Sequence, residues 1–287
     1  VFSDEADYSS LLREVESAPP VLIVRGDGAM LHRPCVAIVG ARNASAAACR
    51  FARQLAADLA ARGVTVVSGL ARGVDTAAHV GALGGATAAV IASGIDIAFP
   101  TENAALQDRI AADHLLMTEQ PPGTEPLARH FPARNRIIAG VAQGTVVIEA
   151  APRSGSLITA RRAGDYGREV MAVPGSPLDP RAQGCNLLIR EGATLVQNAD
   201  DVIEALGPID ARMTRAAPRL RDVASTGPQV AEGDRGAIAS LLGATPVAID
   251  ELVRQSGRPA AAVQLVLLEL ELAGRLERHA GARVSVA

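Results

Sequence analysis

Short apolar runs alternate with longer stretches of helical periodicity through most of the chain. Runs of buried-strand length occur at residues 36–39, 64–67, 87–91, 115–118, 145–148 and 169–173. Between them, apolar residues recur three or four positions apart, as they do on one face of a helix. Strands and helices that alternate in this way are typical of a parallel sheet covered on both faces. The pattern predicts an α/β fold with a doubly wound, mostly parallel sheet.

The pattern changes after residue 207. Residues 208–233 are rich in Pro, Ser, Thr, Gly and charges without periodicity, which predicts a linker. Further on, helical stretches at 237–242, 249–256 and 259–273 precede an alternating segment at 274–286 that contains a Gly turn. Three helices and a hairpin indicate a small winged helix-turn-helix. The expected organisation is a sheet domain with its lead-in at 1–207, a linker at 208–233 and a winged-helix domain at 234–287.

Composition narrows the classes of function. The 287 residues carry a formal net charge of -3, and all 28 basic residues are Arg. Phosphate contacts would therefore come from guanidinium groups, backbone N–H groups and hydroxyls. Cys35, Cys49 and Cys185 are widely spaced and form no CxxC pair, so we expect neither a disulfide framework nor a zinc site. This cysteine usage predicts a reducing, cytoplasmic setting.

The ends and the apolar runs argue against a membrane protein. No apolar run approaches the ~20 residues that a spanning helix needs. The start lacks the charged and apolar leader of a signal peptide. Because the first residue is Val rather than Met, we expect that part of the N-terminus is missing.

A basic cluster at residues 129–162 is the strongest chemical signal. It holds six arginines against one acid, Glu149. A basic cluster in a slightly acidic chain indicates a local anionic ligand. Ser154, Gly155 and Ser156 add flexible backbone and two hydroxyls. The arginines are Arg129, Arg134, Arg136, Arg153, Arg161 and Arg162.

Two loops at the carboxyl ends of neighbouring predicted strands add to this cluster. The first contains Gly40, Arg42 and Ser45, and the second contains Gly69, Arg72 and Gly73. A helix N-terminus after such a loop offers free N–H groups to an anion, and ligands of parallel sheets bind at this edge. Neither loop has the Gly-Lys pair of a nucleotide triphosphatase or a GxGxxG fingerprint. The alternative is two ordinary turns in which Ser45 and Asp75 cap the following helices.

Other candidate groups allow a functional and a structural interpretation. Asp75 and His79, four residues apart on a helix, could hold a metal, but no third ligand is placed and capping explains Asp75. Ser68 and His79 do not form a hydrolase triad, because Ser68 lies on no GxSxG elbow. Glu149 could be a general base, although a salt bridge to a cluster arginine is favoured. Phe131 could stack on a base or pack the loop, and both remain open.

Six short segments occur in a characteristic order: VAIVGAR at 36–42, SGLARGVD at 68–75, FPARNRIIAG at 131–140, SGSLITA at 154–160, VPG at 173–175 and GCNLLIREGA at 184–193. Together they resemble the DNA-processing protein A family (DprA, also called Smf). The resemblance covers residues 8–206, and the tail resembles the winged helix of many members. Departures are Ala92-Ser93-Gly94, where the family usually has an earlier Gly, and Phe99, where it usually has Tyr.

The resemblance implies an extended Rossmann-like domain that binds single-stranded DNA, dimerises and loads the RecA recombinase during natural transformation, so protecting incoming DNA. The residues themselves place no base beside a nucleophile, cluster no metal ligands and lack the Lys of an NTPase in the two loops, so we expect no enzyme activity, cofactor or metal. The expected DNA site, with the loop glycines included, is Gly40, Arg42, Ser45, Gly69, Arg72, Gly73, Phe131, Arg134, Asn135, Arg136, Ser154, Gly155 and Ser156.

The segment Leu187, Leu188 and Ile189 is the expected dimer contact. Three consecutive apolar residues on a helix spread around its axis, so some of them can face outwards. The family points to the same segment. The alternative is that all three belong to the core.

Two other functions compete with a DNA-binding mediator. One is a nucleotide-processing enzyme that cleaves nucleoside monophosphates, with Glu149 as a catalytic group. The other is a regulator that reads duplex DNA through residues 234–287. The predicted recognition helix at 259–273 has two acids, Glu269 and Glu271, and no basic residue, which disfavours duplex reading.

Overall fold

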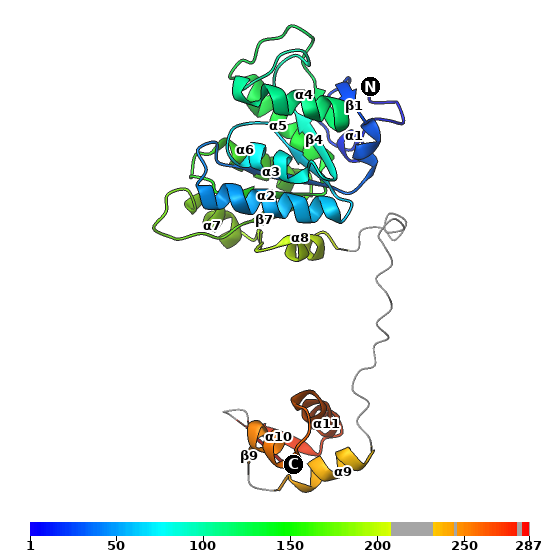
Figure 1. Cartoon of the computed structure of the whole chain (residues 1–287), viewed down its shortest axis with the longest axis vertical. Coiled ribbons are helices and arrows are strands. Elements are labelled where there is room, and N and C mark those ends of the chain that lie inside the picture. Colours follow the sequence, from blue (N-terminus) through cyan, green and yellow to red (C-terminus); the bar gives the residue numbers. More distant parts are fainter. Residues whose placement is uncertain (208–231, 244–245, 280–282, 287) are drawn as a thin grey trace. The chain divides into compact units, whose positions relative to one another are not determined.

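The computed structural model describes residues 1–207, 232–243, 246–279 and 283–286. The chain divides into two compact units, Val1–Ala217 and Pro218–Ala287 (Figure 1). The predicted linker 208–233 lies outside the described residues except at 232 and 233, where the first helix of the second unit begins. No helix in the described segments has both the length and the apolar character needed to cross a membrane.

In the described part of the first unit, one eight-stranded sheet has the order β1-β5-β4-β3-β2-β6-β7-β8. All pairings from β5 to β8 are parallel, and β1 (Ile23–Gly26) pairs antiparallel with β5. The predicted mostly parallel sheet is confirmed; β1 and β8 were not predicted. The remaining strands are β2 Cys35–Gly40, β3 Thr65–Ser68, β4 Ala86–Val90, β5 Leu115–Thr118, β6 Gly144–Ile148, β7 Glu169–Ala172 and β8 Thr194–Leu195.

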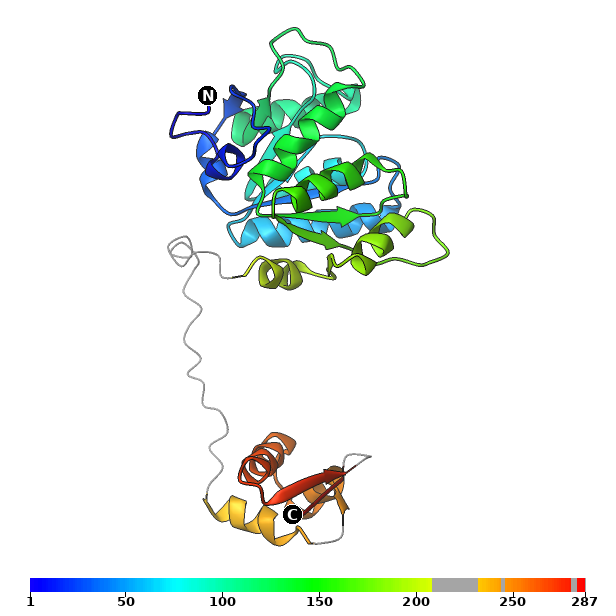
Figure 2. The ribbon, with the colours of Figure 1, turned by 180° about the vertical axis from the view of Figure 1, so that it is seen from behind.

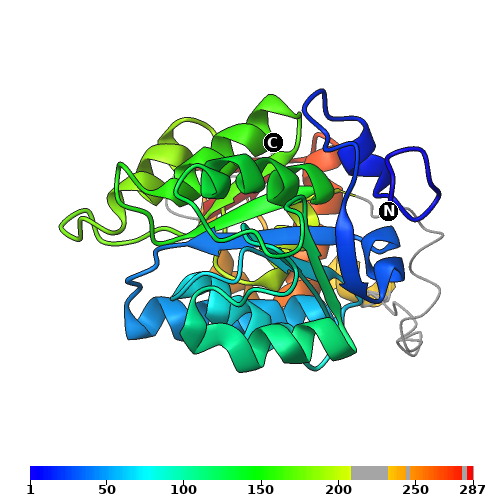
Figure 3. The same cartoon turned by 90° about the horizontal axis from the view of Figure 1, so that it is seen from above.

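Helices cover both faces of this sheet, because alternate residues of the buried strands point to opposite sides. Ala37 and Val39 pack with α1, α5 and α6, whereas Val36 and Ile38 pack with α2, α3 and α8. The two layers are visible from behind (Figure 2) and from above (Figure 3). The helices are α1 Ser10–Arg13, η1 Gly28–His32, α2 Ala46–Ala61, α3 Val74–Ala82, η2 Thr101–Asn103, α4 Ala104–Asp113, α5 His130–Val141, α6 Gly155–Asp165, α7 Gln183–Arg190 and α8 Ala199–Ala205.

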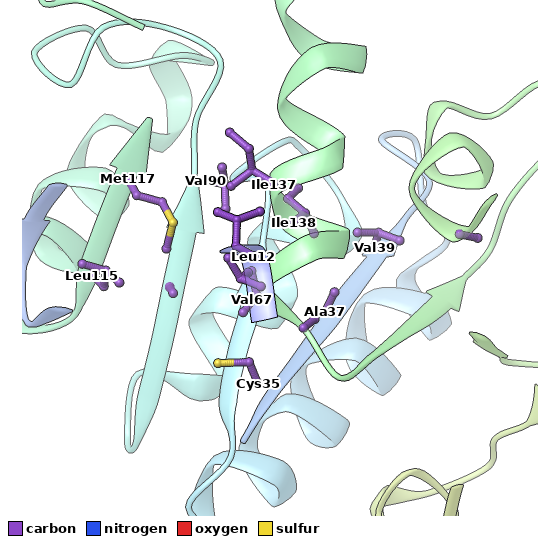
Figure 4. Packing of buried hydrophobic residues seen from close by; sticks show 14 of the residues in the cluster. Leu12, Cys35, Ala37, Val39, Val67, Val90, Leu115, Met117, Ile137 and Ile138 are labelled. Carbon is purple, nitrogen blue, oxygen red and sulfur yellow. The ribbon is translucent and has the colours of Figure 1, made fainter. Parts of the chain in front are cut away.

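Helix α5 carries part of the basic cluster, and its opposite face anchors it in the core. Ile137 and Ile138 are fully buried and lie close to Val90 and Val67 of the sheet and to Leu12 of α1 (Figure 4). Burying a side chain of this size stabilises a fold by about 1.5–3 kcal/mol. The first turn of α5 is therefore held rigidly at the carboxyl edge of the sheet.

The second unit packs helices on a small antiparallel sheet of order β10-β11-β9. Its core includes Ile238, Leu252, Val263, Leu267 and Val284. The predicted helices and hairpin are confirmed, and β9 adds a strand that was not predicted. The elements are α9 Glu232–Ser240, β9 Val247–Ala248, α10 Ile249–Ser256, α11 Ala260–Leu272, β10 Leu276–His279 and β11 Arg283–Val286.

Candidate nucleic-acid interface

The loops after β2, β3 and β6 meet the first turn of α5 at the carboxyl edge of the sheet. They form a hollow of about 770 Å³, here called the main groove. Its lining joins segments far apart in the sequence, as expected for the ligand edge of a parallel sheet. Apolar side chains make up much of this lining. Its polar and charged members are Arg42, Asn43, Asp75, Arg134, Asn135, Arg153, Ser154, Ser156, Thr159 and Arg181, and Gly40 and Gly155 add backbone.

A second hollow of about 420 Å³ adjoins the main groove and is here called the aromatic pocket. Phe99 and Phe131 line it together with Arg72 and Ser93. Arg42, Asn43, Ala71, Phe131 and Arg134 line both hollows. Of the predicted site residues, all but Ser45, Gly73 and Arg136 line one hollow or both.

Arg42 and Phe131 stand where the two hollows meet. The guanidinium carbon of Arg42 lies 5.1 Å from the centroid of the Phe131 ring, which is a cation–π contact. The Phe131 ring also lies 5.7 Å from the Phe99 ring, centroid to centroid, at 56°. Among the residues that the structure describes, Arg42 makes no salt bridge, and its side chain is exposed. Arg42 is thus oriented by an aromatic ring and keeps its donors for an anion.

Arg134 was predicted to contact phosphate, but the residue is only 4% exposed. Its Nη1 donates to the carbonyl of Val90 over 2.7 Å, and its Nε is buried without a partner. Burial lowers the pKa of Arg134 to about 10, against the attraction of Asp75. The group therefore stays charged at neutral pH. Arg134 forms the floor of both hollows and supplies positive potential from below.

Asp75 does not cap α3, contrary to the prediction. Gly73 takes the N-cap position, and the buried Asp75 carboxylate accepts hydrogen bonds from the backbone N–H groups of Gly69 and Ala71, over 3.2 and 3.4 Å. Burial raises the pKa of Asp75, and the charge of Arg134 opposes this rise. The carboxylate holds the loop after β3 in place from its buried side, because it accepts hydrogen bonds from residues four and six positions earlier in the chain.

The loop glycines are required by close packing. A Cβ at Gly69 would lie 1.7 Å from Nη1 of Arg134, and one at Gly40 would lie 1.9 Å from the carbonyl oxygen of Ile148. Gly73 has a φ of 77°, a left-handed conformation that favours glycine, and faces the carbonyl of Ala41. These positions bring three loops close together, which narrows the space above Arg134.

Ser45 and Glu149 bond to each other. The Ser45 N–H donates to Glu149 Oε2 over 2.8 Å, and the Ser45 hydroxyl donates to Oε1 over 2.5 Å. The same hydroxyl accepts from the Ala48 N–H, which confirms Ser45 as the cap of α2. Among the described residues Glu149 makes no salt bridge to a cluster arginine, so that interpretation is wrong. The N–H and hydroxyl donors of Ser45, which was predicted to contact phosphate, are engaged by Glu149. A carboxylate of the chain itself occupies the positive end of this helix dipole.

The remaining predicted arginines are paired with acids. Arg72 pairs with Glu102 while both side chains are more than half exposed, so the pair contributes little and can open. Arg136 pairs with Glu119, and both side chains are less than one-fifth exposed. Arg136 therefore braces α5 instead of facing the main groove, contrary to the prediction.

The start of α6 presents the other polar wall of the main groove. Ser154 caps the helix, its Oγ accepts from the Ser156 N–H over 3.4 Å, and the two hydroxyl oxygens lie 2.7 Å apart. Asn135 Nδ2 donates to the Gly155 carbonyl over 3.3 Å, which ties α5 to this turn. Free N–H groups at a helix start favour an anion. Arg153 is exposed beside them.

Sequence reasoning placed Arg153 in the basic cluster but did not assign it to the site, and it missed Arg181. Arg181 lies in the segment after β7 and pairs with Asp179 over 2.9 Å. A basic residue close behind the VPG segment was the available signal. Arg161 and Arg162, by contrast, belong to the cluster in sequence but do not line the main groove.

The other chemical candidates have structural roles. His79 Nδ1 lies 2.7 Å from the Thr87 hydroxyl, and Ser68 donates to the Ile38 carbonyl over 2.6 Å. Burial lowers the pKa of His79 to about 3. Within the described segments, no three His, Cys, Asp or Glu side chains converge as a metal site. Asp75 and His79 thus stabilise the fold separately.

Comparison with known proteins identifies the family of the chain. The model of the DNA recombination-mediator protein A family matches residues 1–207, and that of the DprA winged helix domain matches residues 223–282. DNA processing protein DprA of Streptococcus pneumoniae is 48% identical over 194 residues, 67% of this chain and 68% of that protein. Protein Smf of Escherichia coli is 38% identical over 285 residues, 95% of this chain and 73% of that protein.

Solved structures show the same fold. The X-ray structure of the Streptococcus pneumoniae protein superposes with a TM-score of 0.67 over 69% of this chain and 70% of that chain. DNA processing protein A from Helicobacter pylori, whose structure describes its single-stranded DNA binding mode, is 28% identical, with a TM-score of 0.65 over 72% of this chain and 98% of that chain. By its family match and its relatives, the chain belongs to the DNA recombination-mediator protein A family.

Proposed function

We propose that this chain is a recombination mediator that binds single-stranded DNA in the main groove. The observation that carries the proposal is the meeting of exposed Arg42 and Arg153, buried Arg134 and the start of α6 at one edge of the sheet. Backbone phosphates are the anions that such donors fit, since guanidinium forks and helix N–H groups both bind them. The Helicobacter pylori relative, with its single-stranded DNA binding mode, supports this assignment.

The same proposal includes the family's wider role. The chain acts in the cytoplasm, protects incoming strands and loads RecA on them during natural transformation. It works as a homodimer through α7, where Leu187, Leu188 and Ile189 are half-buried. Support comes from membership of the mediator family, and the contact with RecA is tested separately by loading assays with purified recombinase.

Arg42→Ala tests phosphate binding. We expect the affinity for single strands to fall roughly 10- to 100-fold, because a charge-assisted hydrogen bond contributes about 1.5–3 kcal/mol. The slope of log affinity against log salt should flatten by about one phosphate contact, whatever the base sequence. Gel shifts over a salt series measure both.

Arg161→Ala is the matched control, since Arg161 is an exposed arginine of the cluster outside the main groove. It should leave affinity and slope unchanged. Wild-type binding that does not depend on salt, or an Arg42→Ala protein that binds normally, contradicts the proposal.

We further propose that the chain catalyses no reaction. The support is the position of Glu149, whose two carboxylate oxygens both accept hydrogen bonds from Ser45. Glu149→Gln should lower the free energy of unfolding by about 1–2 kcal/mol, because a charged capping contact is lost. It should change no turnover of ATP or nucleoside monophosphates. Release of free base by the wild type that stops in Glu149→Gln, but not in Glu125→Gln, would establish the nucleotide-processing alternative.

A further inference from the structure

We propose that Glu119 and Arg136 are a positioning pair for strand binding, which holds helix α5 on the sheet so that Arg134 lies under the main groove. Neither Glu119 nor Arg136 lines the main groove or the aromatic pocket, so the pair acts through α5 without touching the strand. The inference rests on the proposed function, because it concerns the affinity of the same groove for single-stranded DNA. It adds that this affinity depends on an ion pair outside the groove.

Helix α5 is enclosed from two sides. Ile137 and Ile138 are buried in the core on the sheet side. Arg136 and Gly140 are four positions apart and therefore share another face of the helix. A Cβ at Gly140 would lie 2.5 Å from Cδ1 of Leu12, so helix α1 covers this face closely. Arg136 thus lies on the side of α5 that the N-terminal segment covers.

The pair itself is shielded from solvent. The side chains of Arg136 and Glu119 are 19% and 16% exposed, and Arg136 Nη2 donates to Glu119 Oε2. Tyr8 of the N-terminal segment lies close enough for both charges to act on its hydroxyl. Burial raises the pKa of Tyr8 to about 12, the charge of Arg136 opposes this rise, and that of Glu119 adds to it. A pair in this position is only weakly screened by salt.

The pair ties α5 to the carboxyl edge of the sheet at a second point. Arg134 makes the first tie, because its Nη1 donates to the carbonyl of Val90 at the end of β4. Glu119 directly follows β5, whose Met117 lies opposite Val90. Side chains two positions apart on a helix point about 200° apart around its axis. Arg134 and Arg136 thus hold α5 from different sides, which restrains its rotation.

Stability alone does not explain the pair. Oε1 of Glu119 and Nη1 of Arg136 are buried without a hydrogen-bond partner among the described residues. An ion pair left partly unsatisfied adds little to the free energy of unfolding, since the desolvation of both charges opposes their attraction. Apolar side chains of similar volume often leave stability unchanged or raise it. They lack the directionality of a hydrogen bond, which fixes the orientation of the helix.

The orientation of α5 decides where the charges of the main groove lie. The Arg134 guanidinium is so close to Gly69 that a Cβ there would lie 1.7 Å from Nη1. A rotation of α5 would therefore press this group against the loop after β3 or withdraw it. The same rotation would displace Phe131, whose ring orients Arg42. Both the buried and the exposed arginine of the groove thus depend on the position of α5.

The double variant Glu119→Leu/Arg136→Met removes both charges and keeps side chains of comparable length. Its urea midpoint should stay close to that of the wild type. Its affinity for a thymidine oligonucleotide should fall roughly 3- to 30-fold. The slope of log affinity against log salt should stay unchanged, because no phosphate contact is lost. Arg136→Lys keeps a cation for Glu119 and should keep most of the affinity.

Glu14→Leu/Arg168→Met is the matched control. Arg168 and Glu14 form an ion pair over 3.1 Å between the start of β7 and the end of α1, and they line neither hollow. The Arg168 side chain is 15% exposed, much like that of Arg136. This variant should keep the affinity and slope of the wild type. An equal loss of affinity in it would assign the effect to general loosening of the domain and disprove the positioning role.

The remaining outcomes separate the positioning role from the proposed function. A folded Glu119→Leu/Arg136→Met protein that binds as tightly as the wild type disproves the role while phosphate binding stands. A slope that flattens by one phosphate contact also disproves it, because Arg136 then meets phosphate itself. If the wild type binds no single strands, the proposed function fails and the inference fails with it. Circular dichroism confirms folding, and Glu119→Gln, with the same expected affinity and slope, replaces the double variant if that is unfolded.

Discussion

Charged residues at the candidate site divide into those that face a ligand and those that hold the loops. Asp75 and Glu149 both turn inwards, the first onto the N–H groups of Gly69 and Ala71 and the second onto Ser45. A local pattern can show that an acid lies near a helix start. It cannot show a partner such as Glu149, which is 104 positions from Ser45. Residue types alone therefore overestimate how many charges are available to the ligand.

His79 predicts acid sensitivity of the first unit. Its ring is fully buried, Nε2 has no partner in the described structure, and its pKa is lowered to about 3. In the unfolded chain the His79 imidazole takes up a proton near pH 6.5, whereas in the folded chain it does so only near pH 3. Stability from this group is complete above pH 6.5 and is lost as pH falls towards 3. Between pH 7 and pH 5 the loss is about 2 kcal/mol.

Urea unfolding at the two pH values measures this loss. His79→Gln, which cannot take up the proton, should lower stability at pH 7 but show a pH dependence smaller by that amount. A variant as sensitive to acid as the wild type would assign the effect to other groups. Asp75 contributes the opposite pH dependence of stability. Burial raises its pKa, so as pH falls the folded chain takes up this proton before the unfolded chain does, which stabilises the fold.

Elements with strong patterns were predictable, and those that depend on distant partners were not. The strand at 115–118 and the helix at 249–256 are predicted with the boundaries that the structure has, since each is bounded by clear breaks in pattern. β8 has two residues and β1 is an antiparallel edge strand, so neither has the long apolar run of a central strand. The position of the candidate site could be predicted from the carboxyl ends of the parallel strands. The ion pairs of Arg72 with Glu102 and of Arg136 with Glu119 could not be predicted, because the partners are 30 and 17 positions apart in the sequence.

Helix α7 predicts which substitution separates dimerisation from folding. Leu188 and Ile189 pack against the core cluster of the sheet domain, whereas Leu187 does not belong to it. Leu187→Arg should give a folded monomer by light scattering, because it places charge on the proposed contact. Leu188→Arg should also destabilise the domain, since Leu188 is half-buried against that cluster. A Leu187→Arg protein that keeps the mass of the wild type rules out this face as the contact.

At the scale of the whole molecule, the arginines and the helix start suited to binding single-stranded DNA lie in the first unit, Val1–Ala217. The predicted domain 234–287 balances six acids against six arginines. Its helix α11 contains Glu269 and Glu271 and no basic residue. Such a helix is poorly suited to the major groove, where phosphates flank the bases. We propose that this domain serves protein contact or regulation, with 208–233 as its linker.

Deletion of residues 211–287 tests this division. The affinity for single-stranded DNA should stay within about tenfold of the full chain, under roughly 1.4 kcal/mol. Gel shifts on single and double strands with both proteins make the comparison. Tight, sequence-dependent binding of duplex DNA by the isolated second unit would contradict the argument from charge.

The exposed ring of Phe99 also marks a position where a fluorescent side chain could be introduced. The sequence has no Trp, so Phe99→Trp would introduce its sole indole at the mouth of the aromatic pocket. The emission of that indole depends on how much water surrounds it. A strand bound beside this position would exclude part of the water and change the emission. Stopped-flow fluorescence could then time the approach of a strand to Phe99, while anisotropy of a labelled strand reports its overall binding.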